Sequence, residues 1–483
     1  MNKKVLFAVL LFFFLACIKI FFYDSLWFDS AFSMEYIDTY SVKEMFLQPS
    51  DVHTPVYYVV LKFSQFFFSG VVFARLLSVF FGIGFFLILF KVLSKLYSED
   101  FAGFVVLVMS VLSSFLYVFT EIRMYSLGLF IGVSAFYCLI NFVKPNIFKD
   151  KYFLLFFLLS FLGVWVHYYF VFFVLMCFVY LWLFNRKVIV DSLKQFFLFG
   201  SIFWIPLLVY FYVQVSSIAG MWFDKVTFLH FFSSLYYAFF YSDVMSFSLF
   251  ESVFGFLFVF FCLFMVFYYL LVLDEFKPYF KDLSVFFLLL GVVPQILGLL
   301  INNFFSVYHH RFFIFSLWGF LVVVLRSFYI WYYKSYKLRF LELAFPLIII
   351  LVVYKLLFFY SNAMTELVDV NSFILENDFC SEDYFVLHES PFSSVATQYY
   401  FRVNNCSLNN VLLTNLTVKQ LGSAGGSVIP VDKIIRDLKF LPSNEGLYFR
   451  SDEMNLLSEW NCVLLQDLDG LSLFYCEKGD FYD

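Results

Sequence analysis

Apolar runs separated by short polar segments extend from the N-terminus to about residue 360. Each run approaches the roughly 20 residues that a helix needs to cross a bilayer. The pattern predicts membrane spans at residues 5–22, 71–93, 101–119, 124–143, 152–166, 168–184, 195–213, 248–272, 283–301, 312–331 and 340–359. Beyond residue 360 the composition becomes mixed. We therefore expect an all-α polytopic membrane domain of about eleven helices at 1–360 and a second domain at 361–483.

The composition supports a membrane protein. Of 483 residues, 63% are hydrophobic and only 14% are charged, with a mean hydropathy of +0.88. A soluble chain of this size has too little interior for so many apolar side chains. The first run, Val5–Phe22, follows basic residues as in a signal peptide, but no small-residue cleavage site follows it, so we interpret it as a retained span. The net charge of −5 and the lack of a basic patch argue against nucleic acid as a partner.

The basic residues predict the orientation in the membrane. They mark alternate loops, at Lys3 and Lys4, Lys91 and Lys95, Lys144 to Lys151, Arg186 to Lys194, Lys277 and Lys281, and Lys334 to Arg339. Loops rich in Lys and Arg are cytoplasmic as a rule. We therefore expect a cytoplasmic N-terminus in the cell membrane. An odd number of spans then places the C-terminal domain outside the cytoplasm. The acidic segment 23–53 faces outward and is long enough to hold interfacial helices.

Glu121 and Arg123 lie in "FTEIRMYSLGLF", between two predicted spans. With Lys95 inside, a span of about 20 residues from Phe101 ends near Thr120, so the pair lies at the outer interface. Two interpretations remain open. The pair either ends two helices and sits among lipid headgroups, or belongs to a functional site, as ionisable residues near membrane helices commonly do.

Other polar residues collect at the same face. The predicted topology places Asp29, His53, Arg75, His167, His309, His310 and Arg311 there. Arg binds phosphate through two parallel hydrogen bonds, and a carboxylate accepts a proton from a hydroxyl group or holds a divalent metal. Such a cluster, reached from the membrane, suits chemistry on a lipid phosphate. The chain has no phosphate-binding loop of the soluble nucleotide type.

The order of the motifs resembles a known family. "LWFDSAFS", "DVHTPVYYVVLKF", "FARLLSVFFGIG", "FTEIRMYSL", "VHYY" and "HHRFF" follow one another along the chain. This resembles the membrane-bound GT-C glycosyltransferases of the protein mannosyltransferase and aminoarabinose transferase type, whose pattern runs Trp-x-Asp-Glu, His-Pro-Pro-Leu-Tyr-Tyr, Arg-Leu-x-Ser and Glu-x-Arg-Met-Tyr-Ser-Leu. The match covers the first third of the chain well and the rest mainly by topology.

The resemblance implies a membrane enzyme that takes a sugar from a polyprenyl-phosphate carrier. The sugar passes, with inversion, to a protein, lipid or glycan acceptor on the extracytoplasmic face. Asp29 is the expected catalytic base and Glu121 the second acid, and both are candidate ligands if the enzyme uses a divalent metal cation; no other cofactor is implied. Two positions depart from the family pattern: Ser30 replaces Glu and Thr54 replaces Pro.

Further site residues complete the hypothesis. The expected donor phosphate ligands are Arg123, Arg75 and Arg311, and the expected substrate-binding residues are His53, Tyr57, Tyr58, Tyr125, His167 and His310. The alternatives are a transporter or flippase of lipid-linked saccharides and an O-antigen-type ligase or polymerase. A transporter should carry polar residues near the bilayer midplane and related halves. Here the polar residues collect at one face, and no internal repeat is evident.

The C-terminal domain is predicted to be mixed α/β or β-rich. Short alternating runs predict strands in "DYFVLHES", "NVLLTNLTV", "EGLYFRS" and "NCVLLQDLDGLSLFYCE", with some helix near 431–438. Its four cysteines, an even number outside the cytoplasm, suggest disulfides. Cys462 and Cys476 would face each other if the chain reverses about Asp469 with a five-residue loop; Cys380 or Cys406 is the alternative partner.

Overall fold

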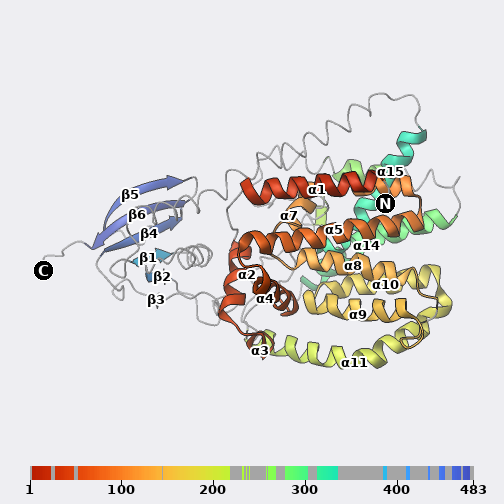
Figure 1. The fold of residues 1–483 in the computed structure, drawn as a ribbon, viewed down its shortest axis with the longest axis horizontal. Helices are drawn as coiled ribbons and strands as arrows, with labels where there is room; N and C mark the ends of the chain where they lie inside the picture. Colours follow the sequence, from red (N-terminus) through yellow and green to blue (C-terminus); the bar gives the residue numbers. More distant parts are fainter. Residues whose placement is uncertain are drawn as a thin grey trace. The chain divides into compact units, whose positions relative to one another are not determined.

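The computed structural model of the chain is mostly helical (Figure 1). The structure describes residues 3–22, 28–47, 53–143, 145–217, scattered helical residues between 231 and 267, 278–302, 313–334, and six strands between 385 and 478. The helices are α1 (Lys3–Phe22), α2 (Phe28–Thr39), α3 (Val42–Leu47), α4 (Val56–Phe67), α5 (Val71–Leu96), α6 (Glu99–Val111), α7 (Ser113–Val118), α8 (Tyr125–Leu139), α9 (Lys151–Val166), α10 (Phe170–Phe184), α11 (Arg186–Ser217), α14 (Pro278–Asn302) and α15 (Ile314–Lys334).

Five helices within the described residues are long and apolar enough to cross a membrane. They are Lys3–Phe21, Val71–Leu96, Arg186–Gln214, Leu283–Asn302 and Ile314–Trp331. The shorter apolar helices α8, α9 and α10 also fall on predicted spans. The predicted span 340–359 lies outside the described residues, and 248–272 lies largely outside them. The protein is therefore a helical membrane protein, and the count of eleven spans stays a prediction.

The predicted span 101–119 is not one helix. The helix breaks at Leu112, whose backbone is extended with φ −68° and ψ 135°, and α6 and α7 lie on either side of it. All six residues of α7 are buried. Broken helices are tolerated at membrane depth where surrounding protein covers the backbone. The break is therefore consistent with a segment enclosed by neighbouring helices.

Polar caps begin two of the apolar helices. The Ser98 hydroxyl accepts a hydrogen bond from the Phe101 N–H of α6 at 3.3 Å. The Asp150 carboxylate accepts one from the Tyr152 N–H of α9 at 2.9 Å. A helix start leaves backbone N–H groups without intrahelical partners, and such side chains satisfy them. The caps fix where these helices begin.

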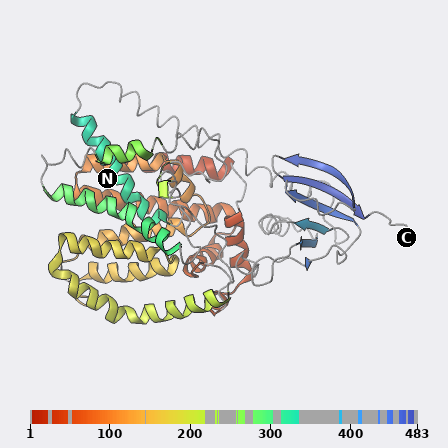
Figure 2. The ribbon, with the colours of Figure 1, turned by 180° about the vertical axis from the view of Figure 1, so that it is seen from behind.

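Small residues let two of the membrane helices pack closely. A Cβ added at Gly291 of α14 would lie 2.7 Å from the backbone nitrogen of Phe320 in α15, and one added at Gly319 would lie 2.8 Å from the Phe287 carbonyl oxygen. Glycine permits such backbone approach between membrane helices. Figure 2 draws these two helices in green and teal. In Figure 1 the axes of α5, α8, α9 and α10 lie nearly parallel to one another.

The described elements fall into two compact units. The first unit contains α1, α4 to α10, α11 as far as Val209, α14 and α15. The second unit contains α2, α3, the end of α11 and the strands. Within the second unit the Tyr210 hydroxyl donates a hydrogen bond to the Met45 carbonyl oxygen at 3.3 Å. The three helices α2, α3 and α4 lie in or next to the long polar segment expected to hold interfacial helices. The division at residue 360 stays a prediction.

The strands of the C-terminal region form one mixed six-stranded sheet in the order β3-β2-β1-β4-β6-β5. They are β1 (Phe385–His388), β2 (Asn409–Leu413), β3 (Lys433–Ile435), β4 (Glu445–Ser451), β5 (Trp460–Leu468) and β6 (Leu471–Lys478). The pairs β1–β2, β1–β4 and β2–β3 are parallel, whereas β4–β6 and β5–β6 are antiparallel. The expected helix near 431–438 is wrong at β3, which pairs with β2. The fold class of the whole domain stays a prediction.

The β5–β6 pair sets Cys462 opposite Cys476. The predicted five-residue loop is wrong, because β5 continues to Leu468 and β6 begins at Leu471. The register shifts between Leu464 and Gln466, so one extra residue on β5 moves the pairing beyond that point by one. Cys462 and Cys476 lie outside the shifted part of the pairing and stay directly opposite each other. Two residues separate the end of β5 from the start of β6.

Candidate functional site

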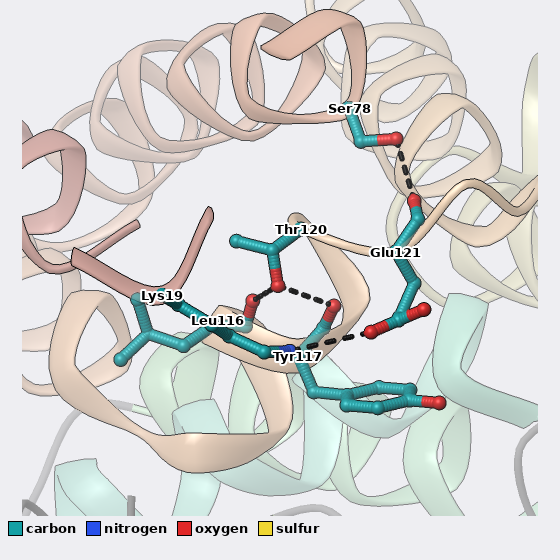
Figure 3. Close-up of polar contacts among 6 residues, drawn as sticks. All are labelled: Lys19, Ser78, Leu116, Tyr117, Thr120 and Glu121. Carbon is teal, nitrogen blue, oxygen red and sulfur yellow. Dashed lines mark hydrogen bonds and ion pairs between the residues drawn. The ribbon is translucent and has the colours of Figure 1, made fainter. Parts of the chain in front are cut away.

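The turn at residues 119–124 joins α7 to α8 and is buried throughout. Several of its backbone groups bond to protein: the Thr120 and Glu121 N–H groups both donate to the Tyr117 carbonyl oxygen at 3.0 Å. The Ser78 hydroxyl of α5 donates to the Glu121 carbonyl oxygen at 2.7 Å (Figure 3). Unsatisfied backbone groups at membrane depth cost several kcal/mol, so these bonds allow a turn here. The turn is part of the protein interior, which argues against a simple end of two helices among headgroups.

The Glu121 carboxylate faces a cation from the first helix. The Lys19 ammonium nitrogen lies 3.4 Å from Glu121 Oε1, and the two side chains are 14% and 4% exposed. Lys19 also lies 4.4 Å from the ring centroid of Tyr117, in a cation–π arrangement. The positive charge of Arg75 in α5 is also close enough to repel the Lys19 ammonium group. Two helices, α1 and α5, thus bring cationic side chains to the turn that carries Glu121.

The Arg123 guanidinium meets the aromatic start of α4. Its Nη1 donates a weak hydrogen bond to the Tyr58 hydroxyl at 3.4 Å, and the Tyr57 and Tyr58 rings lie edge to face, 5.6 Å apart. Burial raises the pKa of Tyr57; the Arg123 charge opposes this rise and the Glu121 charge adds to it. The Tyr57 phenol therefore stays protonated and offers a hydrogen-bond donor beside both charges.

Two histidines and a tyrosine of the site pack against one another. The His53 and His167 ring centroids lie 5.1 Å apart, and Tyr125 lies 6.1 Å from His167. Burial lowers the pKa of His167 well below its ordinary value, and the nearby charges of His53 and Arg123 lower it further. Its Nδ1 accepts a hydrogen bond from the Tyr169 N–H at 3.2 Å, so the neutral ring carries its proton on Nε2.

The structure thus brings most of the predicted residues of the first unit into one buried cluster. Its members from the sequence-based prediction are His53, Tyr57, Tyr58, Arg75, Glu121, Arg123, Tyr125 and His167, and each is at most 7% exposed. The cluster forms where α1 ends and α4, α5 and α8 begin. It gathers guanidinium, ammonium, carboxylate, phenol and imidazole groups, a set suited to binding an anion and positioning a hydroxyl group.

Asp29 belongs to the second unit. It lies in the first turn of α2, where the helix dipole stabilises a negative charge. The Ser33 hydroxyl donates to the Asp29 backbone carbonyl oxygen at 2.8 Å. His310 and Arg311 lie outside the described residues. The roles assigned to these three residues stay predictions.

Sequence reasoning missed Lys19, Ser78 and Tyr117. A signal existed for Lys19, which is the basic residue in the last turn of a helix that is apolar from Val5 to Ile18. The predicted topology places that helix end at the face where Lys and Arg are few. Lys19 was therefore predicted to lie at the same membrane face as Glu121. Ser78 and Tyr117 carry no comparable signal, because Ser and Tyr occur throughout these helices.

The described residues contain no group of three or more His, Cys, Asp or Glu side chains arranged to hold a metal ion. The two carboxylates considered as metal ligands, Asp29 and Glu121, belong to different units. Metal dependence therefore stays untested.

Comparison with known proteins identifies the fold. No family model matches the chain, and no curated protein sequence matches it. Among solved structures, the chain is similar to ArnT from Cupriavidus metallidurans bound to undecaprenyl phosphate, with a TM-score of 0.57, 10% identity, and coverage of 98% of this chain and 97% of that one. The apo state of ArnT gives a TM-score of 0.49 at 11% identity, covering 97% of each chain. The first of these similarities shows that the protein has an ArnT-like fold.

Proposed function

We propose that the protein is an integral membrane glycosyltransferase that uses a polyprenyl-phosphate-linked sugar. The observation that carries this proposal is the buried cluster around the 119–124 turn, where Arg75 and Arg123 gather with Glu121 in a fold like that of ArnT. The solved ArnT structure holds undecaprenyl phosphate. A lipid-borne anion is the ligand class that suits buried guanidinium groups in a membrane protein.

The donor phosphate is proposed to bind Arg123 and Arg75. A guanidinium offers parallel N–H donors that match phosphate oxygens, and in a water-poor site each donor is worth about 2.7–4 kcal/mol for developing negative charge. Arg123 is 7% exposed and Arg75 is 5% exposed, so both meet the water-poor condition. Arg311 is the third proposed phosphate ligand.

Asp29 is proposed as the catalytic base. An acceptor hydroxyl oxygen attacks the anomeric carbon of the donor sugar as the bond from that carbon to the phosphate oxygen breaks. The bonding electron pair leaves with the polyprenyl phosphate, and the hydroxyl proton passes to the Asp29 carboxylate. Attack opposite the leaving group inverts the anomeric carbon. The role of Glu121 as a second acid stays a prediction.

The His53, His167, Tyr57 and Tyr125 side chains are proposed to line the sugar site. Aromatic and imidazole rings offer flat apolar surfaces, and their N–H and O–H groups bond to sugar hydroxyls. His167 is neutral at physiological pH because burial lowers its pKa, so it contributes a hydrogen bond rather than a charge. The proposed orientation keeps the N-terminus in the cytoplasm and the chemistry at the outer face.

The experiment must separate a transferase from a transporter. Purified protein in liposomes is given a polyprenyl-phosphate sugar with label in the sugar, together with cell-envelope acceptors. A transferase cleaves the sugar–phosphate bond, whereas a flippase moves the lipid across the bilayer with that bond intact. Movement of intact donor without cleavage would establish the transporter and contradict the proposal.

A matched arginine pair provides the control. Arg123→Lys keeps the charge but loses the planar fork, so it should weaken donor use roughly 10-fold, the loss of one good charged hydrogen bond. Arg186 is exposed at the start of α11, so Arg186→Lys should leave donor use unchanged. Equal behaviour of the two variants would remove Arg123 from the phosphate site.

A further inference from the structure

Three contacts from other helices converge on the turn that precedes Arg123. Lys19 of α1 meets the Glu121 carboxylate, and Ser78 of α5 binds the Glu121 carbonyl oxygen (Figure 3). The Phe119 ring packs so tightly against Gly82 of α5 that an added Cβ would lie 2.6 Å from its Cγ. Glu121 is therefore held at both its backbone and its side chain.

Lys19 is unusual for its position. It is a largely buried ammonium group in a helix whose other residues are almost all apolar. A charged residue within a membrane helix is costly and is retained where it has a partner and a role. Its 3.4 Å separation from Glu121 Oε1 is longer than the 2.7–2.9 Å of a tight ionic hydrogen bond, so one short bond does not account for its presence.

We propose that Lys19 and Glu121 form a positioning pair that fixes the turn and thereby aims the Arg123 guanidinium at the donor phosphate. This inference rests on the proposed function. Glu121 and Arg123 are two residues apart in one short turn, so a change in the backbone of the turn at Glu121 moves the base of the Arg123 side chain. Lys19 acts through the turn and is not itself a phosphate ligand. The Glu121 carboxylate takes part in this pairing.

The alternative role for Lys19 is direct contact with the phosphate, and a double-mutant cycle distinguishes the two. If Lys19 acts through Arg123, Lys19→Met and Arg123→Lys should each weaken binding of undecaprenyl phosphate roughly 10-fold, and the double variant should be little worse than either. If Lys19 contacts the phosphate independently, the losses multiply to roughly 100-fold. The second result would overturn the positioning role.

Full-length protein in detergent is used, and the dissociation constant of undecaprenyl phosphate is measured by its displacement of a fluorescent polyprenyl phosphate. Lys19→Arg keeps the cation and should bind within about 3-fold of the unmodified protein, a rescue that loss of fold would not give. Lys4 lies in the same helix and pairs with Asp100 at 2.7 Å, but the two side chains are 58% and 69% exposed. Lys4→Met is the matched control and should leave the dissociation constant unchanged.

The remaining outcomes are distinct. A Lys19→Met protein that is less thermostable but binds undecaprenyl phosphate as tightly as the unmodified protein would show a purely structural role and refute the inference. Failure of the unmodified protein to bind undecaprenyl phosphate at any concentration would instead refute the proposed function.

Discussion

Neutralising Glu121 should destabilise the helix bundle more than deleting the whole ion pair. Glu121→Gln keeps the shape of the side chain but leaves the Lys19 ammonium facing an amide. Removing one partner of a buried pair costs about 3–5 kcal/mol, because the remaining charge stays buried without compensation. Lys19 retains 14% exposure and the pair is 3.4 Å apart, so we expect the lower end, about 3 kcal/mol.

The double variant Lys19→Met/Glu121→Gln removes both charges. Replacing a buried pair by uncharged groups of similar volume is often close to neutral, so the double variant should recover most of the lost stability. The exposed Lys4–Asp100 pair serves as the control, since exposed pairs contribute at most about 1 kcal/mol. Lys4→Met should therefore unfold close to the unmodified protein.

The assay is thermal unfolding of the four purified proteins in one detergent, followed by tryptophan fluorescence. The expected order of apparent Tm is the unmodified protein and Lys4→Met highest, the double variant next, and Glu121→Gln lowest. An unchanged Tm for Glu121→Gln would show that the Lys19–Glu121 pair does not contribute to the stability of the fold. A double variant less stable than Glu121→Gln would show that the two charges do not compensate each other.

Three further predictions follow from separate parts of the molecule. Gly82→Ala should cost about 1–3 kcal/mol by overpacking against Phe119, and it should weaken undecaprenyl phosphate binding in the displacement assay; tight binding would show that the turn tolerates displacement. Because folding lowers the pKa of His167, the unfolded chain binds the additional proton, so stability should fall as pH drops below about 6.5, by at most about 1.4 kcal/mol per pH unit. His167→Gln should flatten this slope in Tm measured from pH 5 to 8, and an unchanged slope would assign it to other groups. Cys462 and Cys476 should form a disulfide, since they are opposite on neighbouring strands; a free Cys462 in non-reducing peptide mapping would exclude it.

The sequence predicted that the candidate site residues lie together, because the membrane topology determines which helix ends lie at the same face. Apolar length fixed where each span ends, and the distribution of basic residues fixed which ends share a face. His53, Arg75, Glu121 and His167 were therefore expected together although up to 114 positions separate them along the chain, and the structure clusters them. The motif order indicated the same fold that the comparison with ArnT supports.

Other features depended on contacts that no local pattern reveals. The break at Leu112 follows neither a proline nor a glycine, and neighbouring helices enclose the segment after it. The loop between β5 and β6 was predicted wrongly because a bulge changes the register without changing the alternation near Cys462. Lys19 was overlooked because the basic residues were weighed for orientation and not for pairing with Glu121.

Whether this site takes sugar from a polyprenyl phosphate can be measured directly as sugar transfer by the purified protein. A panel of polyprenyl-phosphate sugars, each labelled in the sugar, is incubated with cell-envelope acceptors, and release of polyprenyl phosphate is followed. We expect acceptor-dependent consumption of at least one donor, and a loss of roughly 100-fold or more in Asp29→Asn, which cannot accept the hydroxyl proton. Consumption of no donor by the unmodified protein, or near-native transfer by Asp29→Asn, would contradict this expectation.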